Sequence, residues 1–95
     1  MHASEGVTLL IPSALRPYCD GATRLMVQAA TVRHALEDIR AQHESLVHRV
    51  LTRDGQLRPF VRVFVRNDDV RDLQGLDTPL HDGEVITIVP AVAGG

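Results

Sequence analysis

The chain has 95 residues, of which 44% are hydrophobic and 23% charged, as is typical of one small globular domain and not of a disordered chain. The formal net charge of -2, with arginines interleaved among acidic residues, argues against a nucleic-acid-binding or membrane-surface protein. Because the chain has no Trp, one Tyr and two Phe, its core must be built from aliphatic side chains.

Other features of the sequence indicate where such a domain works. No apolar run approaches the ~20 residues of a membrane span, and the N-terminus lacks the basic and apolar regions of a signal peptide. The single cysteine cannot form an internal disulfide. We therefore expect a cytoplasmic protein. We also expect the protein to be a monomer when alone.

The first quarter of the chain predicts a wide β-hairpin. Residues 7–11 alternate between the two faces of a strand, which Pro12 ends. Residues 12–21 then form a long connection that closes on a turn at Asp20-Gly21, and residues 23–29 form the second strand. The inward-facing residues of this hairpin are Val7, Leu9, Ile11, Leu25 and Val27.

A helical pattern follows the hairpin. Thr31 is a suitable N-cap, because its hydroxyl can accept a hydrogen bond from a free backbone N–H of the first turn. Apolar residues recur at helical spacing behind it, and predict an amphipathic helix over 32–43 with a further helical turn at 45–51. The apolar face consists of Val32, Ala35, Leu36, Ile39, His43, Leu46, Val47 and Val50.

The second half of the chain returns to strands. Residues 60–66 alternate between valines and polar or aromatic side chains, which predicts a half-buried third strand. A tight turn at 67–69 leads into a short strand around Val70 and Arg71. The looser stretch 72–80 carries two leucines that we expect to pack on the core, Leu73 and Leu76.

The last strand is predicted over 85–89, after a turn at Asp82-Gly83, with Ile86 and Ile88 inward. The order of elements is thus ββαββ, which predicts an α+β fold with one main helix on a mixed sheet of four to five strands. We expect the last strand to pair beside the first, as in a β-grasp (ubiquitin-like) fold. Residues 1–95 then form a single domain, with 90–95 as an extended C-terminal tail.

The tail carries the clearest chemical signal. Pro90 removes a backbone donor and should end the strand, and no large or charged side chain follows it before Gly94-Gly95. Six extended residues would reach up to about 20 Å. The reactive group at the tip is the α-carboxylate of Gly95, and glycine can enter a narrow tunnel because it has no Cβ. A frayed terminus with no function is the plain alternative.

These features together resemble the ThiS/MoaD/CysO family of ubiquitin-like sulfur carriers, and are most similar to its CysO-like members. The similarity extends over nearly the whole chain, and the ending Pro-x-Val-Ala-Gly-Gly is specific for this group. Arg66 before Asn67-Asp68-Asp69 is a small departure that affects no chemistry. The stretches that carry the resemblance are Ile11-Pro12, Leu15-Arg16-Pro17, 60–71, 80–84 and 88–95.

The resemblance implies a sulfur carrier protein rather than an enzyme. A partner adenylyltransferase of the ubiquitin-activating (ThiF/MoeB-like) type would use ATP and Mg²⁺ to adenylate Gly95. Sulfide, or a persulfide from a sulfurtransferase, would then replace AMP and leave a thiocarboxylate. A sulfur-accepting synthase, for which a pyridoxal-phosphate enzyme is one candidate, would receive the sulfur for cysteine, cofactor or secondary-metabolite biosynthesis.

The same resemblance assigns roles along the tail. Gly95 is the reacting residue and Gly94 gives clearance in the partner's tunnel. Ala91, Val92 and Ala93 are the part that a partner grips, with Val92 as an apolar hook. Phe64, facing outward on the third strand, is a candidate docking residue; it can equally be a half-covered edge of the core.

Other reactive side chains give weaker signals. The histidines lack the i, i+4 spacing of helical metal ligands, and the chain has no paired cysteines, so we expect no metal site. Asp20 should raise the pKa of the Cys19 thiol, which argues against a catalytic cysteine. Glu37 and Asp38 are expected on a solvated helix face. His81 attracts attention as a neighbour of the tail's base, although a plain surface position is the simpler expectation.

Three alternatives remain open at this point. In a protein modifier, a lysine amine of a target protein would capture the activated Gly95. A non-covalent binding module would use its sheet as the docking face and would not need Gly94-Gly95. A permanent enzyme subunit would form a stable complex with a larger chain.

Overall fold

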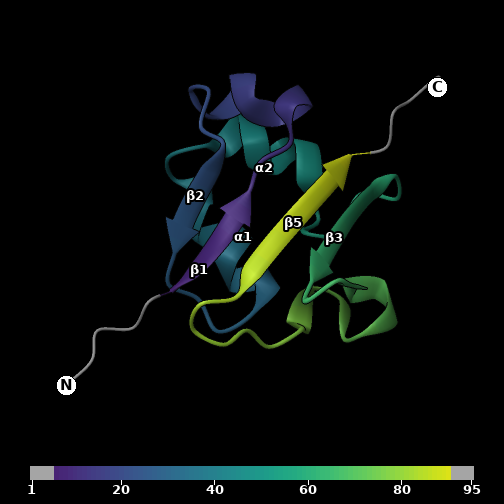
Figure 1. Cartoon of the computed structure of the whole chain (residues 1–95). Coiled ribbons are helices and arrows are strands. Elements are labelled where there is room, and N and C mark those ends of the chain that lie inside the picture. The colour runs from purple at the N-terminus through teal and green to yellow at the C-terminus, as the bar shows by residue number, and fades with distance from the viewer. Residues whose placement is uncertain (1–5, 91–95) are drawn as a thin grey trace.

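Five strands form one mixed sheet in the order β2-β1-β5-β3-β4 (Figure 1). The structure is a computed structural model and describes residues 6–90. The strands are β1 (Val7–Leu10), β2 (Arg24–Val27), β3 (Val61–Val65), β4 (Asp68–Asp69) and β5 (Val85–Pro90). The helical segments are η1 (Ser13–Cys19), α1 (Val32–Arg40), α2 (Glu44–Val50), η2 (Val70–Asp72) and η3 (Gly75–Asp77).

The last strand lies in the centre of the sheet. It runs parallel to β1, with Leu9 opposite Ile86, and antiparallel to β3, with Val63 opposite Ile88. The first two strands form the expected antiparallel hairpin. The β-grasp prediction, with first and last strands side by side, is therefore confirmed.

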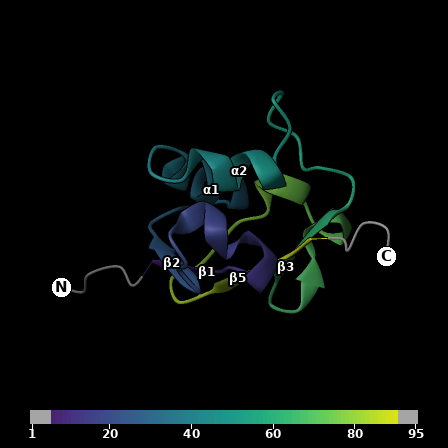
Figure 2. The same cartoon turned by 90° about the horizontal axis from the view of Figure 1, so that it is seen from above.

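The core fills the space between the sheet and the helices, which cover one of its faces (Figure 2). The predicted alternation is confirmed in every strand except at Leu25, which is only partly buried. The largest side chains that are fully buried are Leu9, Ile11, Leu36, Leu46, Leu51, Ile86 and Ile88. Thr78 is the one buried polar side chain among residues 6–90, and its hydroxyl donates to the Gly75 carbonyl at 2.7 Å.

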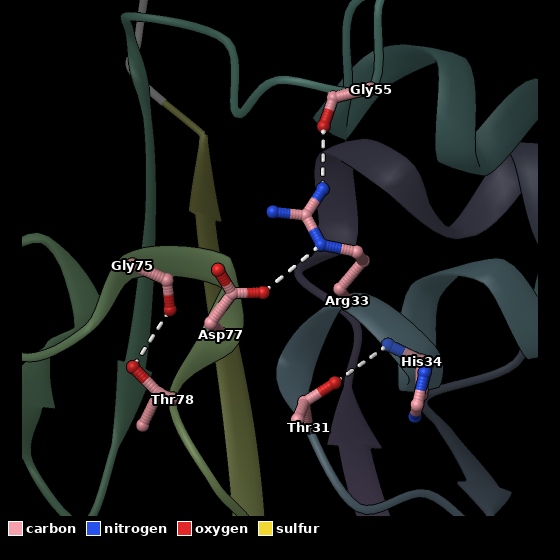
Figure 3. Close-up of polar contacts among 7 residues, drawn as sticks. All are labelled: Thr31, Arg33, His34, Gly55, Gly75, Asp77 and Thr78. Carbon is pink, nitrogen blue, oxygen red and sulfur yellow. Dashed lines mark hydrogen bonds and ion pairs between the residues drawn. The ribbon is translucent and has the colours of Figure 1, made fainter.

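The first helix begins as predicted and ends earlier. The Thr31 hydroxyl accepts a hydrogen bond from the His34 N–H at 3.1 Å (Figure 3), which confirms the N-cap. The helix stops at Arg40 instead of 43, because the backbone of His43 leaves the helical region (φ −138°, ψ 57°). This break lets α2 start in a new direction while its apolar side chains still reach the core.

The connection over residues 12–21 was predicted as a loop, but most of it, Ser13–Cys19, forms the 3₁₀ helix η1. Within it, Leu15 and Cys19 are buried against the core. Pro17 lies inside this helix, because a short 3₁₀ segment tolerates it. Asp20 ends the helix in the left-handed region with φ 58°.

The turn after β3 is shorter than predicted. Arg66 and Asn67 both have left-handed φ angles, 54° and 72°, as a two-residue hairpin turn requires. The fourth strand therefore comes two residues early, at Asp68–Asp69, and Val70 and Arg71 lie in the 3₁₀ helix η2 instead. Of the two leucines that follow, Leu76 is buried as expected, whereas Leu73 is 38% exposed.

Arg33 joins three segments that are far apart in the sequence (Figure 3). Its Nε donates to the Asp77 carboxylate at 3.2 Å, and its Nη1 donates to the Gly55 carbonyl at 3.4 Å. The backbone N–H of Val32 also donates to the Thr78 carbonyl at 3.2 Å. The start of α1 thus fixes the long connection that leads into the central strand.

Candidate functional site

The site predicted from the sequence lies at the C-terminus, and most of it falls outside the described residues. This is the case for Gly95, Gly94, Ala93, Val92 and Ala91. What the structure defines is the place from which they extend. Pro90 is the last residue of β5, opposite Val61 of β3, so the strand continues one residue further than expected. We call the end of the sheet where β5 finishes the exit end.

The exit end is held together by an arginine. Arg71 donates from Nη1 to the Val61 carbonyl and from Nη2 to the Arg58 carbonyl, both at 2.8 Å. The Val61 N–H in turn donates to the Arg58 carbonyl at 3.1 Å. These bonds fix the start of β3, which is the strand segment that pairs with Pro90. The position from which the C-terminus leaves is therefore well anchored.

Phe64 lies on the open face of the sheet, away from the helices, as predicted. It is half-buried, opposite Thr87 of the central strand, and it helps to line a hollow with Arg66, Asn67, Gly83, Glu84, Val85 and Thr87. Exposed apolar side chains on the same sheet extend this surface: Leu10, Met26, Val85 and Val89. The sequence indicated Phe64 as the one docking candidate on the sheet, although the alternation in each strand also places the other four on this face.

Phe60 is a further exposed apolar residue that the sequence did not identify as a docking candidate. Its side chain is 75% exposed, and it precedes Val61 at the exit end. An aromatic side chain this exposed next to the start of the C-terminal segment is available to a partner protein. Only the pairing of Val61 with Pro90 reveals this proximity, and that pairing is a long-range contact.

An ion pair stabilises the opposite end of the sheet. Arg66 and Glu84 form a salt bridge, and the His81 N–H donates to the other Glu84 oxygen at 2.8 Å. Partial burial is the largest influence on the pKa of Glu84 and would raise it. The combined effects of Arg66 and of the His81 backbone and side chain outweigh burial, so the pKa lies below its usual value.

His81 does not belong to the C-terminal site. It is exposed, as the simpler expectation held, and it precedes the start of β5, whereas the C-terminus leaves from the other end of that strand. A six-residue strand spans roughly 20 Å. The idea that His81 lies near the base of the C-terminal tail is therefore wrong.

Cys19 is a buried thiol. Its Sγ lies 3.6 Å from the Ala22 carbonyl oxygen. Burial raises the pKa of this thiol, and the Asp20 carboxylate adds to the shift, so the predicted direction is confirmed. The larger cause, burial, was not predicted because the connection was expected to be an open loop. A protonated, buried thiol is a poor nucleophile.

The structure also bears on metals and membranes. Within residues 6–90, no group of three or more His, Cys, Asp or Glu side chains could hold a metal ion. His48 and Glu44 form a pair only, with His48 Nε2 3.7 Å from a Glu44 carboxylate oxygen. In the same part of the chain, no helix is long and apolar enough to cross a membrane.

Comparison with known proteins identifies the family. The model of the ThiS family matches residues 11–95. The sulfur carrier protein CysO of Mycobacterium tuberculosis (strain H37Rv) is 36% identical over 91 residues, which cover 94% of this chain and 98% of the relative.

Solved structures agree with this match. CysO in the BexX/CysO complex of Amycolatopsis orientalis superposes with a TM-score of 0.86 and 37% identity, covering 95% of this chain and 100% of that one. The crystal structure of M. tuberculosis CysO gives a TM-score of 0.84 and 34% identity, covering 92% and 100%. The chain therefore belongs to the ThiS family and has the β-grasp fold of CysO.

Proposed function

We propose that this protein is a sulfur carrier that bears its sulfur as a thiocarboxylate on Gly95. The observation that carries the proposal is the family match, which covers residues 11–95. The 36% identity to a sulfur carrier over 94% of the chain supports it. So does the central strand, because it ends at the anchored Pro90 and leaves five residues for the C-terminal segment.

The chemistry takes place at the α-carboxylate in two steps. A carboxylate oxygen attacks the α-phosphorus of ATP, which gives a Gly95 acyl-adenylate and releases pyrophosphate. A sulfide or persulfide sulfur then attacks the carbonyl carbon, and the bond to AMP breaks. With sulfide the product is the thiocarboxylate directly. With a persulfide the product is an acyl disulfide to the sulfurtransferase cysteine, and a second thiol must cleave its S–S bond, which releases the thiocarboxylate and leaves that thiol in a disulfide with the cysteine.

The carrier itself supplies a substrate and no catalytic side chain. Gly95 reacts, and Gly94 lets the backbone pass through a narrow channel because it has no Cβ. Ala91, Val92 and Ala93 are the segment that a partner grips. ATP and Mg²⁺ bind to the partner adenylyltransferase of the ThiF/MoeB type, and the carrier holds no cofactor of its own.

The partners are an activating enzyme, a sulfide source or sulfurtransferase, and an accepting synthase. Phe64 and its apolar neighbours on the open sheet face, with Phe60 at the exit end, are the surface that we propose for docking. A solved relative with 37% identity was obtained as a complex with another protein, BexX, which supports partner binding through this fold. A pyridoxal-phosphate enzyme that makes cysteine is the proposed acceptor.

Intact mass spectrometry tests the proposal. The full chain is incubated with ATP, Mg²⁺, a sulfide source and a ThiF/MoeB-type adenylyltransferase. We expect a mass gain equal to the exchange of one oxygen for sulfur, located at Gly95 by fragmentation. A chain with one alanine added after Gly95 is the control and should not gain sulfur, because its reacting carboxylate is displaced and carries a side chain.

Two results would contradict this function. Equal sulfur loading of the extended chain would show that Gly95 is not the reacting residue. Isopeptide adducts on other proteins, without a thiocarboxylate, would instead identify a protein modifier.

A further inference from the structure

A cationic groove lies beside the exit end, on the side of the molecule that bears η1 and α2. It is about 600 Å³ in volume, and the proposed function gives it no role. In Figure 1, η1 (indigo) and α2 lie toward the end of the sheet at which β5 finishes. We define the cationic groove by its lining residues, which are Tyr18, Ser45, His48, Arg49 and Arg58.

The two arginines of the groove are held in place. The Nε of Arg58 donates to the His48 carbonyl at 2.6 Å, and the Arg58 carbonyl accepts from Arg71. The central carbon of the Arg49 guanidinium lies 4.3 Å from the centre of the Tyr18 ring. Because this cation–π contact is to an aromatic ring and not to an oxygen acceptor, the guanidinium N–H groups are left for a bound ligand.

Both guanidinium groups lack an acidic partner among residues 6–90. The ion pairs in this part of the chain involve Arg33, Arg40, His48 and Arg66. Among residues 6–90, the ion pair that a groove residue does form is that of His48 Nε2 with the Glu44 carboxylate, which lies 3.7 Å away and is 71% exposed. Two fixed positive charges therefore line one hollow without neutralisation, although the chain as a whole has a net charge of -2.

We propose that the cationic groove is a binding site for a phosphate-type oxyanion. The donors come from three segments: η1, α2 and the residues before β3. A planar carboxylate needs only one guanidinium fork, whereas a tetrahedral oxyanion can accept from several directions at once. The hydroxyls of Tyr18 and Ser45 add neutral donors beside the two charged ones. Inorganic phosphate and the phosphate of a nucleotide are the two possible sources of this group.

NMR of the full ¹⁵N-labelled chain tests the site. It is titrated with inorganic phosphate, and in a second arm with AMP, at constant ionic strength set with chloride. We expect saturable shifts of the amides of the five groove residues. Arg49→Gln and Arg58→Gln should each weaken binding about tenfold, because each removes a charge-assisted hydrogen-bond donor. If AMP binds more tightly than inorganic phosphate, the nucleotide is the source of the bound phosphate group. If the two bind equally, the free anion is the source.

The controls separate a site from general electrostatics and from misfolding. Arg24→Gln removes an exposed charge on β2, outside the groove, and should leave the affinity unchanged. Arg58→Lys keeps the positive charge at this position. If Arg58→Gln does not fold, Arg58→Lys and Arg49→Gln are the two variants that test the site. Shifts that do not saturate, or that Arg24→Gln reduces as much as Arg49→Gln, would indicate an adventitious ion only and overturn the proposal. Sulfur loading of Gly95 is a separate measurement, so the two proposals can fail independently.

Discussion

Glu84 shows how one carboxylate ties the turn before the central strand to the hairpin after β3. Its side chain is 12% exposed, and it accepts from Arg66 and from the His81 N–H. Its pKa in the folded chain lies below the ordinary value of 4.5. A carboxylate with a lowered folded pKa contributes stability above its unfolded pKa. That contribution is lost as the pH falls through the folded pKa.

Glu84→Gln should therefore lower the free energy of unfolding at neutral pH. It should also reduce the acid slope, by which we mean the decrease in the free energy of unfolding as the pH falls. Urea unfolding at pH 7 and at steps below pH 4.5 measures both effects. Glu37→Gln is the matched control, because it breaks an ion pair with Arg40 in which the Glu37 carboxylate is 45% exposed. It should lower the stability at pH 7 by much less than Glu84→Gln does, because an exposed ion pair contributes little. An acid slope of Glu84→Gln identical to that of the parent would contradict the assignment.

At the level of single residues, the sequence could indicate which groups are reactive and which side chains face outward, but not which residues lie next to one another in the fold. The α-carboxylate of Gly95 and the outward direction of Phe64 follow from local pattern. The wrong expectation for His81 arose because adjacency in sequence was taken for adjacency in space, whereas a strand separates its two ends. The cationic groove could not be predicted, since Tyr18 and Arg49 come together only when η1 packs on α2, and Arg58 joins them through its hydrogen bond to the His48 carbonyl.

Among the secondary-structure elements, α1 depends on its cap. The Thr31 hydroxyl satisfies the His34 N–H at the start of the helix. Thr31→Ala should cost about 1 kcal/mol in the free energy of unfolding, whereas Thr31→Ser keeps the hydroxyl and should restore most of it. Chemical denaturation of the three proteins measures the difference. Equal stability of the alanine and serine variants would show that the hydroxyl contributes nothing.

The entry into β1 depends on Gly6. This residue has φ +73°, and a Cβ built on it would lie 2.5 Å from the Val27 carbonyl oxygen of the neighbouring strand. Gly21 has a similar φ of +82° with nothing within 4 Å of its Cβ position. Gly21→Ala should cost roughly 1–2 kcal/mol from the left-handed backbone alone.

Gly6→Ala should cost clearly more than Gly21→Ala, because its backbone obstacle cannot move without disturbing the β1–β2 pairing. Thermal and urea unfolding of the two variants give the comparison. If both variants lose the same free energy of unfolding, the backbone around Gly6 can make room for a Cβ without a further loss of stability.

Regular elements were predictable where their pattern is local. Alternation with a period of two identified β1, β3 and β5 to within one or two residues, and the helical period identified α1 and α2. The predictions were wrong where the structure depends on backbone dihedral angles that no hydrophobic period reports. The 3₁₀ helix η1 has no distinct period, and the left-handed pair Arg66 and Asn67 shortened a turn that composition alone placed one residue later.

The whole molecule has two ends with different roles. At the end where β5 begins, the turns carry Asp82 and Glu84, and Glu84 is paired with Arg66. At the exit end, Arg58 and Arg71 fix the segment that pairs with Pro90, and Phe60 is exposed beside it. The central strand thus ends, at Pro90, on the side of the molecule where Arg58 and Arg71 hold the start of β3.

If the fold only positions its C-terminus, stability and sulfur transfer should be separable. A chain that ends at Pro90 keeps every residue of the described core and the pairing of Pro90 with Val61. We expect its melting temperature to fall by less than ~4 °C, the smallest shift that ~1 kcal/mol would cause in a domain of this size. Mass spectrometry should find no sulfur loading.

Deletion of residues 2–5, which also lie outside the described range, is the matched control and should preserve both melting temperature and loading. A large drop in the melting temperature of the chain that ends at Pro90 would show that residues 91–95 help to hold the domain together. Sulfur carriage and folding would then depend on the same contacts, and the C-terminus could not act as an independent arm that partners receive.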